Sequence, residues 1–292
     1  MAFSSVDGLL KAAGTSRSPL WAVIMEDDLS DRGATRESSL RQMSGLWEAM
    51  KQSSRDYSAE ARSASGLSGG DGAKMSAYAG SGKGILGIFP DRIVAEALRM
   101  GESNACMKRI VAAPTAGSCG VLPAVIIPLA ERDHIPDSEI VHALYVAAGF
   151  GQIIAARASI SGAEGGCQAE IGSASAMAAA ALVSLKGGTP EMSANACAMA
   201  LMNLMGLVCD PVGGLVEIPC VIRNTAGALN AAGCADMALA GIRSRIPPDE
   251  VIDAMRSVGD SMPSSLRETG RGGLAATPSG IAAARRITHA DP

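Results

Sequence analysis

Three of the chain's seven cysteines lie in backbone rich in glycine and proline: Cys167 in AEGGCQAE, Cys209 in GLVCDPVGG and Cys220 in EIPCVIR. Such backbone leaves room for a bulky group and offers free N–H donors to a charged sulfur. Three thiolates without a nearby histidine make a poor zinc site, which normally has four nitrogen or sulfur ligands. A [4Fe–4S] cube is held by cysteine thiolates, and with only three of them one iron keeps a position open for substrate oxygens. The spacing matches no compact ferredoxin run, and buried cysteine is common. An iron-sulfur site and ordinary buried cysteines therefore both stay open as interpretations at this point.

The other cysteines have a different sequence context. Cys106, Cys197 and Cys234 lie among alanine and methionine, where a thiol behaves as a small hydrophobic group. Cys119, in the glycine loop TAGSCG, is ambiguous. The cysteine count is odd and the first residues do not resemble a signal peptide, so we expect a cytoplasmic protein without a disulfide framework.

The composition predicts an all-α fold. Alanine, leucine and methionine dominate, and alternating runs of β-branched and aromatic residues are few. Between the first two cysteines of interest, Ser173 is the expected N-cap of one helix and Gly187 its stop. Thr189, followed by Pro190, predicts the start of the next helix.

Changes in composition along the chain suggest its organisation. Residues 1–60 are charged and amphipathic, and we interpret them as an N-terminal helical arm or outer layer. Residues 61–292 are expected to form one continuous catalytic domain. Within it, residues 63–84 are rich in glycine and serine and predict a loop region around a site, or a junction.

Bulk properties argue against two classes of partner. A formal charge of −4 and 3% aromatic residues give neither a basic surface nor a stacking platform for nucleic acid. The most apolar stretch, residues 140–160, is interrupted by His142, Gln152 and Arg157. We therefore expect a buried helix there and no membrane span.

Four long motifs, in order along residues 66–280, resemble one known family: VAAPTAGSCGVLPA, SISGAEGGCQAEIGSASAMAAAAL, CDPVGGLVEIPCVIRNTAGALNA and LRETGRGGLAATPSG. The chain is similar to the catalytic α subunit of iron-sulfur-dependent L-serine dehydratase, also called L-serine deaminase. The resemblance rests on several motifs together and is more specific than any pair of cysteines.

The resemblance implies a helical catalytic domain with glycine-rich loops around a buried [4Fe–4S] cluster, held by Cys167, Cys209 and Cys220. It implies a lyase that converts L-serine to pyruvate and ammonia, in amino-acid degradation and gluconeogenesis. In two-chain members a β subunit carries an ACT-like domain and a Ser-Ser-His-Thr motif. The nearest string here is Ser264-Ser265-Leu266, so we expect a separate β subunit as partner.

Glycine-rich turns that enter helices can present N–H groups to a substrate carboxylate. On this basis Thr115, Ser118, Ser161 and Gly162 are the candidate substrate contacts. The same residue types are also the usual turn and cap formers, so a purely structural role is an equal alternative.

The residue that removes the Cα proton is not identified by the sequence. Glu164, Asp210 and Glu217 are close in sequence to the three cysteines, and a carboxylate with a raised pKa can serve as a base. His142 is a fourth candidate, although a histidine in an apolar helix is more often a hydrogen-bonded core residue. The β subunit could also supply the base.

Two other functions remain as alternatives. The cluster could serve a redox or oxygen-sensing protein without lyase activity, or an aconitase-like hydratase of a small hydroxy acid. Electron transfer favours complete cysteine ligation, whereas three ligands and many Gly, Ser and Thr turns favour substrate access. A pyridoxal phosphate enzyme is disfavoured because the lysines in the apolar part of the chain, Lys108 and Lys186, have no phosphate-binding loop near them in the sequence.

Overall fold

Helices make up the regular structure of the chain. The computed structural model describes residues 3–289, and within them the backbone forms no strand, only one isolated bridge between Cys209 and Arg267. The α-helices are α1 (Val6–Ser16), α2 (Leu20–Arg32), α3 (Arg36–Arg55), α4 (Asp71–Gly80), α5 (Ile88–Ala105), α6 (Val121–Asp133), α7 (Asp137–Arg157), α8 (Gly162–Gly165), α9 (Ser173–Leu185), α10 (Pro190–Leu204), α11 (Cys220–Leu239), α12 (Pro248–Ser261) and α13 (Pro278–His289). Short helices of other types are η1 (Gln168–Gly172), η2 (Val212–Gly214), η3 (Ser264–Leu266) and η4 (Gly273–Ala276). The predicted all-α fold is confirmed.

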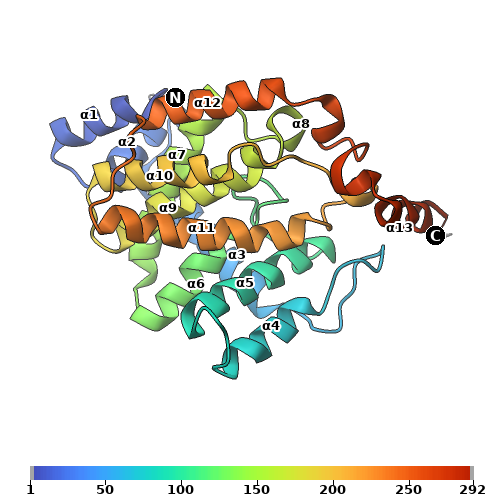
Figure 1. Cartoon of the computed structure of the whole chain (residues 1–292). Coiled ribbons are helices and arrows are strands. Elements are labelled where there is room, and N and C mark those ends of the chain that lie inside the picture. The colour runs from blue at the N-terminus through green and yellow to red at the C-terminus, as the bar shows by residue number, and fades with distance from the viewer. Residues whose placement is uncertain (1–2, 290–292) are drawn as a thin grey trace.

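Helix α9 occupies the centre of the bundle, and α6, α7, α10 and α11 all pack against it (Figure 1). Its sequence SASAMAAAALVSL has small or apolar side chains on every face, and residues 173–183 are all buried. A helix that is apolar all round belongs in a core, and alanine lets neighbouring helices approach closely. Helix α11, which begins at Cys220, and helix α10 are therefore held in place by close packing against α9.

The sequence predicted the N-cap residues of α9 and α10. The prediction is right for α10 and wrong for α9. Thr189 caps α10, since its hydroxyl accepts the N–H of Met192 at 3.2 Å, and Pro190 is the first helical residue. Ser173 is not an N-cap: its backbone is already helical, because the π-helical turn η1 runs directly into α9. Turns of this kind are frequent at functional sites.

The apolar stretch near residue 140 forms α7. This helix is long and apolar enough to cross a membrane, but 67% of its most apolar stretch is buried inside the protein. It packs against α9, α2 and α3. The helix is thus part of the core, as expected from its sequence.

The three N-terminal helices contribute to the same core. Val6, Leu9 and Met25 are buried in one cluster with residues of α7 and α9. The N-terminus of α1 is held by α12, because the carboxylate of Asp249 accepts the N–H groups of Val6 and Asp7 at 2.8 and 3.1 Å. The division of the chain near residue 60 stays a prediction.

The glycine- and serine-rich stretch at residues 63–84 is only partly a loop. Its middle forms α4, which the sequence did not suggest because no cap residue precedes it. The cap comes from elsewhere: the buried carboxylate of Glu102, in α5, accepts the N–H groups of Asp71 and Gly72 at 2.7 and 3.1 Å. A long-range carboxylate replaces the local N-cap.

Candidate metal and substrate site

Three separate segments bring the cysteines of interest together. Cys167 directly precedes η1, Cys209 lies in the loop between α10 and η2, and Cys220 is the first residue of α11. All three are buried, with exposed fractions of 2%, 2% and 7%. The sulfurs of Cys167 and Cys209 and a carboxylate oxygen of Glu170 lie within 4.8 Å of one another. Cys220 interacts electrostatically with Cys167 and Glu170.

The three thiols differ in the direction in which their surroundings shift the pKa. A hydrogen bond from the Cys209 thiol, together with the nearby Arg223, holds the pKa of Cys167 below its ordinary value. The same hydrogen bond and burial raise the pKa of Cys209, and burial raises the pKa of Cys220 to about 12. Among the seven cysteines, all of which the structure describes, only Cys167 has a lowered pKa. Among the three thiols its surroundings favour the thiolate most, and thiolate is the form that binds metal.

Gly162 packs closely against both Glu170 and Cys209. A Cβ atom at this position would lie 2.6 Å from Glu170 Oε2 and 3.1 Å from Cys209 Sγ. Any side chain would therefore fill the volume that the cysteine and the carboxylate face. This observation favours Gly162 as part of the site itself, beyond a role as a turn residue.

Glu170 joins the cysteines to the loop at residues 115–118. Its Oε1 accepts the hydroxyl of Thr115 at 2.8 Å, and the Thr115 and Ser118 hydroxyls are 3.1 Å apart. Its Oε2 faces Cys209 Sγ at 3.9 Å. Burial raises the pKa of Glu170 above the usual range for a carboxyl group. Thr115 and Ser118 are thus linked to the cysteines through Glu170, and their role as substrate contacts stays a prediction.

Ser161, the fourth candidate substrate contact, directly precedes α8 at its N-cap position. Its hydroxyl makes no hydrogen bond within the part of the chain that the structure describes, while its backbone N–H binds the hydroxyl of Ser159 at 3.0 Å. The side chain is partly exposed and leaves its hydroxyl available to a ligand.

Two residues of this site, Glu170 and Arg223, were missed by the sequence analysis. Arg223 donates to Cys167 Sγ at 3.3 Å and forms an ion pair with Asp210 at 2.8 Å. A signal was present, since each of the two follows a cysteine by three residues, in CQAE and CVIR, and residues three apart share a helix face. That spacing acquires meaning only when the cysteine-bearing segments meet in the fold.

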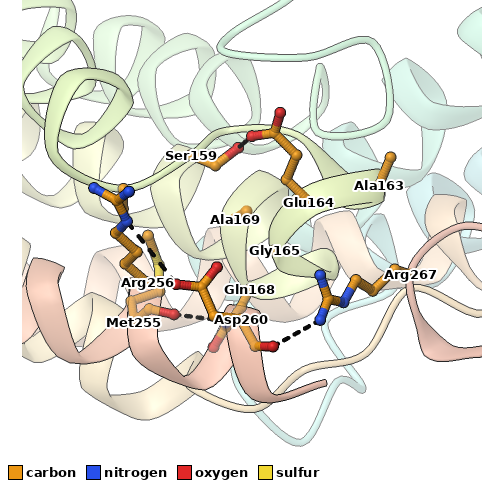
Figure 2. Close-up of a pocket in the computed structure, with 11 residues that line it drawn as sticks. Ser159, Ala163, Glu164, Gly165, Gln168, Ala169, Met255, Arg256, Asp260 and Arg267 are labelled. Carbon is orange, nitrogen blue, oxygen red and sulfur yellow. Dashed lines mark hydrogen bonds and ion pairs between the residues drawn. The ribbon is translucent and has the colours of Figure 1, made fainter. Parts of the chain in front are cut away.

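The structure separates the four candidate bases. Glu164 is exposed and accepts the hydroxyl of Ser159 at 2.6 Å. It lines a cavity of about 230 Å³ between the Cys167 loop and α12, and Figure 2 shows its carboxylate turned toward Ser159. Asp210 is buried and neutralised by its ion pair with Arg223. These contacts give Asp210 an anchoring role.

The other two candidates also face elsewhere. Glu217 accepts hydroxyls of Ser63 and Ser65 at 2.7 and 2.8 Å, at the edge of a groove of about 850 Å³. His142 stacks on Trp21 with ring centroids 3.6 Å apart, and burial lowers its pKa. It lies 15 residues before the carboxyl end of α7, or about 22 Å along the helix, and α7 leads to the site only at that end. The structure does not bring His142 to the cysteines.

Cys119 and Cys197 are buried and take no part in the site. Cys119, three residues from the site loop's Ala116, is turned away: its thiol faces the carbonyl oxygen of Met100 at 3.8 Å. Burial raises its pKa to about 12. Cys197 is fully buried in α10.

These donors fit a metal–sulfur group. Three buried thiols lie near a guanidinium that can balance thiolate charge, and the sulfurs of Cys167 and Cys209 are within 4.8 Å of each other. Gly162 packs so closely against Cys209 and Glu170 that no side chain fits between them. A carboxylate and two hydroxyls line the adjoining side. Thiolate ligands together with one polar side are typical of a metal centre that also binds a small molecule.

Comparison with known proteins gives the family. The family model for the serine dehydratase alpha chain matches residues 15–275. The chain is 47% identical over 285 residues to the probable L-serine dehydratase, alpha chain, of Bacillus subtilis, which covers 98% of this chain and 95% of the relative. It is 51% identical over 203 residues to the L-serine dehydratase, alpha chain, of Peptoniphilus asaccharolyticus, covering 70% of each protein.

A longer relative matches over less of its length. L-serine dehydratase 1 of Escherichia coli is 45% identical over 184 residues, which cover 61% of this chain and 40% of the relative. The chain therefore belongs to the serine dehydratase alpha chain family, and the resemblance found in its motifs is confirmed. The expectation that it is an enzyme of this family is confirmed with it.

Gly162 provides a test of the site geometry. We expect Gly162→Ala to displace Glu170 or Cys209 and to destabilise the protein by about 1–3 kcal/mol, as overpacking commonly does. If these residues form a metal site, the substitution should also lower the amount of metal that the protein takes up. Thermal unfolding of the metal-free protein and iron analysis after reconstitution measure the two effects.

Gly233→Ala is the matched control. Gly233 lies in α11, and a Cβ there would meet no atom within 4 Å. Because alanine is the better helix former, this variant should be as stable as the parent protein or more so. If Gly162→Ala behaves like the control, the space beside Cys209 is not part of the site.

Proposed function

We propose that the chain is the catalytic α subunit of an L-serine dehydratase, which converts L-serine to pyruvate and ammonia with a [4Fe–4S] cluster. The observation that carries the proposal is the grouping of the Cys167 and Cys209 sulfurs with Glu170, close to the buried thiol of Cys220, at a position where Gly162 approaches so closely that no side chain fits. The family supports the reaction, since relatives in it are named L-serine dehydratases.

Cys167, Cys209 and Cys220 are the residues that would hold the cluster. When bound, a cluster with three cysteine ligands would supply a Lewis acid that eases departure of the serine hydroxyl. The guanidinium of Arg223, which donates a hydrogen bond to Cys167 Sγ, would balance part of the negative charge of three buried thiolates. The partly polar side formed by Glu170 and the 115–118 loop is left for the substrate.

The chain's own residues have separate tasks in this reaction. We assign to the hydroxyls of Thr115, Ser118 and Ser161 the binding of the oxygen atoms of a small amino acid; the contacts of Thr115 with Ser118 and Glu170 support this assignment. Dehydration also requires loss of the Cα proton, and of the carboxylates near the cysteines Glu170 is the one that faces this loop. We assign to Glu170 a proton-transfer role toward a molecule held there. The aminoacrylate released after loss of water then tautomerises and hydrolyses to pyruvate and ammonia.

A separate β subunit, expected to carry an ACT-like domain, would complete the enzyme. Two similar proteins are named alpha chains, and the chain spans 40% of the longer Escherichia coli relative. Both facts support an additional part supplied by another chain. A cytoplasmic location accords with seven free thiols and with a small soluble metabolite as substrate.

Metal content and chemistry together test the proposal. Anaerobically reconstituted protein should hold about four irons per chain, as a cubane requires. Replacing Cys167, Cys209 or Cys220 by serine should reduce bound iron to background, whereas Cys197→Ala should keep it. Parent protein that stays colourless and free of iron would contradict the cofactor assignment.

The same preparation separates the proposed reaction from its alternatives. L-serine should perturb the cluster spectrum, which a redox or oxygen sensor would not show. Release of ammonia along with pyruvate distinguishes a deaminase from a hydratase of a hydroxy acid.

Glu170→Gln tests the proton-transfer role. Because the amide keeps the shape but cannot accept the proton, we expect kcat to fall by about 10²- to 10⁴-fold while iron content stays at the parent level. Glu164→Gln is the control, since that carboxylate is exposed and faces Ser159. Full activity of Glu170→Gln would exclude the role.

Dependence on the β subunit is tested by mixing. The α chain alone should bind iron but convert L-serine slowly, and addition of the β subunit should raise kcat. Steady-state ammonia release with and without the second chain measures this. If the purified single chain has the full rate, no partner is required.

A further inference from the structure

Arg223 contacts all three cysteine-bearing segments. It lies one helical turn after Cys220 in α11, and its guanidinium donates to Cys167 Sγ at 3.3 Å. The same group donates to the carbonyl oxygen of Val208 at 2.8 Å and pairs with Asp210 at 2.8 Å, the residues on either side of Cys209. One buried side chain thus spans the whole ligand set.

Asp210 extends these contacts to the C-terminal part of the chain. Its Oδ2 accepts the N–H of Leu274 at 2.7 Å. Gly273 packs directly against it, in a left-handed conformation with φ 56°, and a Cβ there would come within 2.3 Å of the carboxylate. The segment at residues 264–277 is therefore fixed to the Arg223–Asp210 pair.

The shape of the guanidinium matters for this arrangement. A planar fork with five donors can serve a sulfur, a carbonyl and a carboxylate together, whereas an ammonium group is a compact point charge. Asp210 is buried and Arg223 is largely shielded from solvent, with side-chain exposed fractions of 4% and 14%. A buried ion pair persists only when each partner satisfies the other, so removal of Arg223 would leave Asp210 uncompensated.

We propose that Arg223 is the positioning residue of the metal site: it sets the relative placement of the three cysteine segments and donates a charge-assisted hydrogen bond to the sulfur of Cys167. This inference rests on the proposed function, because it assigns the effect of that donor on a bound cluster. Hydrogen bonds to cluster sulfurs raise the reduction potential, and residues that orient ligands commonly change metal affinity by 10- to 100-fold.

The test uses the full-length chain, reconstituted anaerobically with iron and sulfide. The variants are Arg223→Gln, Arg223→Lys, the double variant Arg223→Gln with Asp210→Asn, and Arg132→Gln. Arg132 is the control because it also pairs with a carboxylate, that of Asp133, and within residues 3–289 no hydrogen bond or ion pair links it to a cysteine. Measurements are the rate of iron loss to a chelator, the midpoint potential of the cluster and thermal unfolding without metal.

We expect Arg223→Gln to lose iron roughly 10- to 100-fold faster than the parent and to have a more negative midpoint potential. Arg223→Lys should restore the potential in part, because the charge remains, but not the slow iron loss, because the fork is gone. The double variant removes the uncompensated carboxylate and should unfold like the parent while keeping both cluster defects. Arg132→Gln should match the parent in every measurement.

Two results would overturn the inference in different ways. If the parent and the folded Arg223 variants hold iron with the same loss rate and the same potential, Arg223 has no positioning role and the proposed function stands. If the parent binds no iron at all, the cofactor assignment fails and the role of Arg223 fails with it.

Discussion

The buried ion pair between Arg223 and Asp210 is the interaction on which the site depends. Three sulfurs can bind one metal centre only if segments distant in sequence bring them within a few ångströms of one another. The closer the sulfurs come, the more strongly their negative charges repel. A guanidinium beside Cys167 offsets this repulsion, and its carboxylate partner keeps the guanidinium from being an isolated buried charge. Charge balance and segment placement are therefore the same structural feature.

The helical scaffold makes such a feature possible. Small side chains around α9 let α7, α10 and α11 pack closely, so that the ends of these helices are fixed relative to one another. Cys220 begins α11, and Cys167 lies at the entry to the π-helical turn that continues into α9. Two of the three sulfurs thus lie at the N-terminal ends of helical segments that pack in the core. The Cys209 loop is held by backbone hydrogen bonds to Leu266 and Glu268, and by the contacts of Arg223 with Val208 and Asp210 on either side of the cysteine.

Local chemistry in the sequence predicted what is decided locally. Thr189 with Pro190 starts a helix because a hydroxyl and a fixed φ act within one turn, and the alanine-rich run at residues 173–185 is a core helix because it has no polar face. Ser173 was assigned wrongly, because a π-helical turn carries the helix past a residue of the right type for a cap.

The candidate site was partly visible for the same reason. The three cysteines, Thr115, Ser118 and Gly162 stood out through their glycine- and proline-rich context. Glu170 and Arg223 did not, because their partners lie 55 and 56 residues away in the chain. Likewise, only the fold shows that His142 stacks on Trp21, far along α7 from the cysteines. The spacing of Glu170 and Arg223 from a cysteine was visible in the sequence, but its meaning depends on long-range contacts that only the fold provides.

The segment after α12 shows how residues without metal-binding side chains belong to the site. The backbone of Cys209 pairs with it on both sides, since its N–H donates to Leu266 and its carbonyl oxygen accepts from Glu268, each at 2.8 Å. Glu268 holds a left-handed backbone with φ 62°, a conformation that costs a non-glycine residue on the order of 1 kcal/mol and persists only where the surroundings impose it. Helix α13 then packs on η2, between Cys209 and Cys220. The loop that carries Cys209 has no helix of its own and is held in place by this segment, most of which the family match to residue 275 includes.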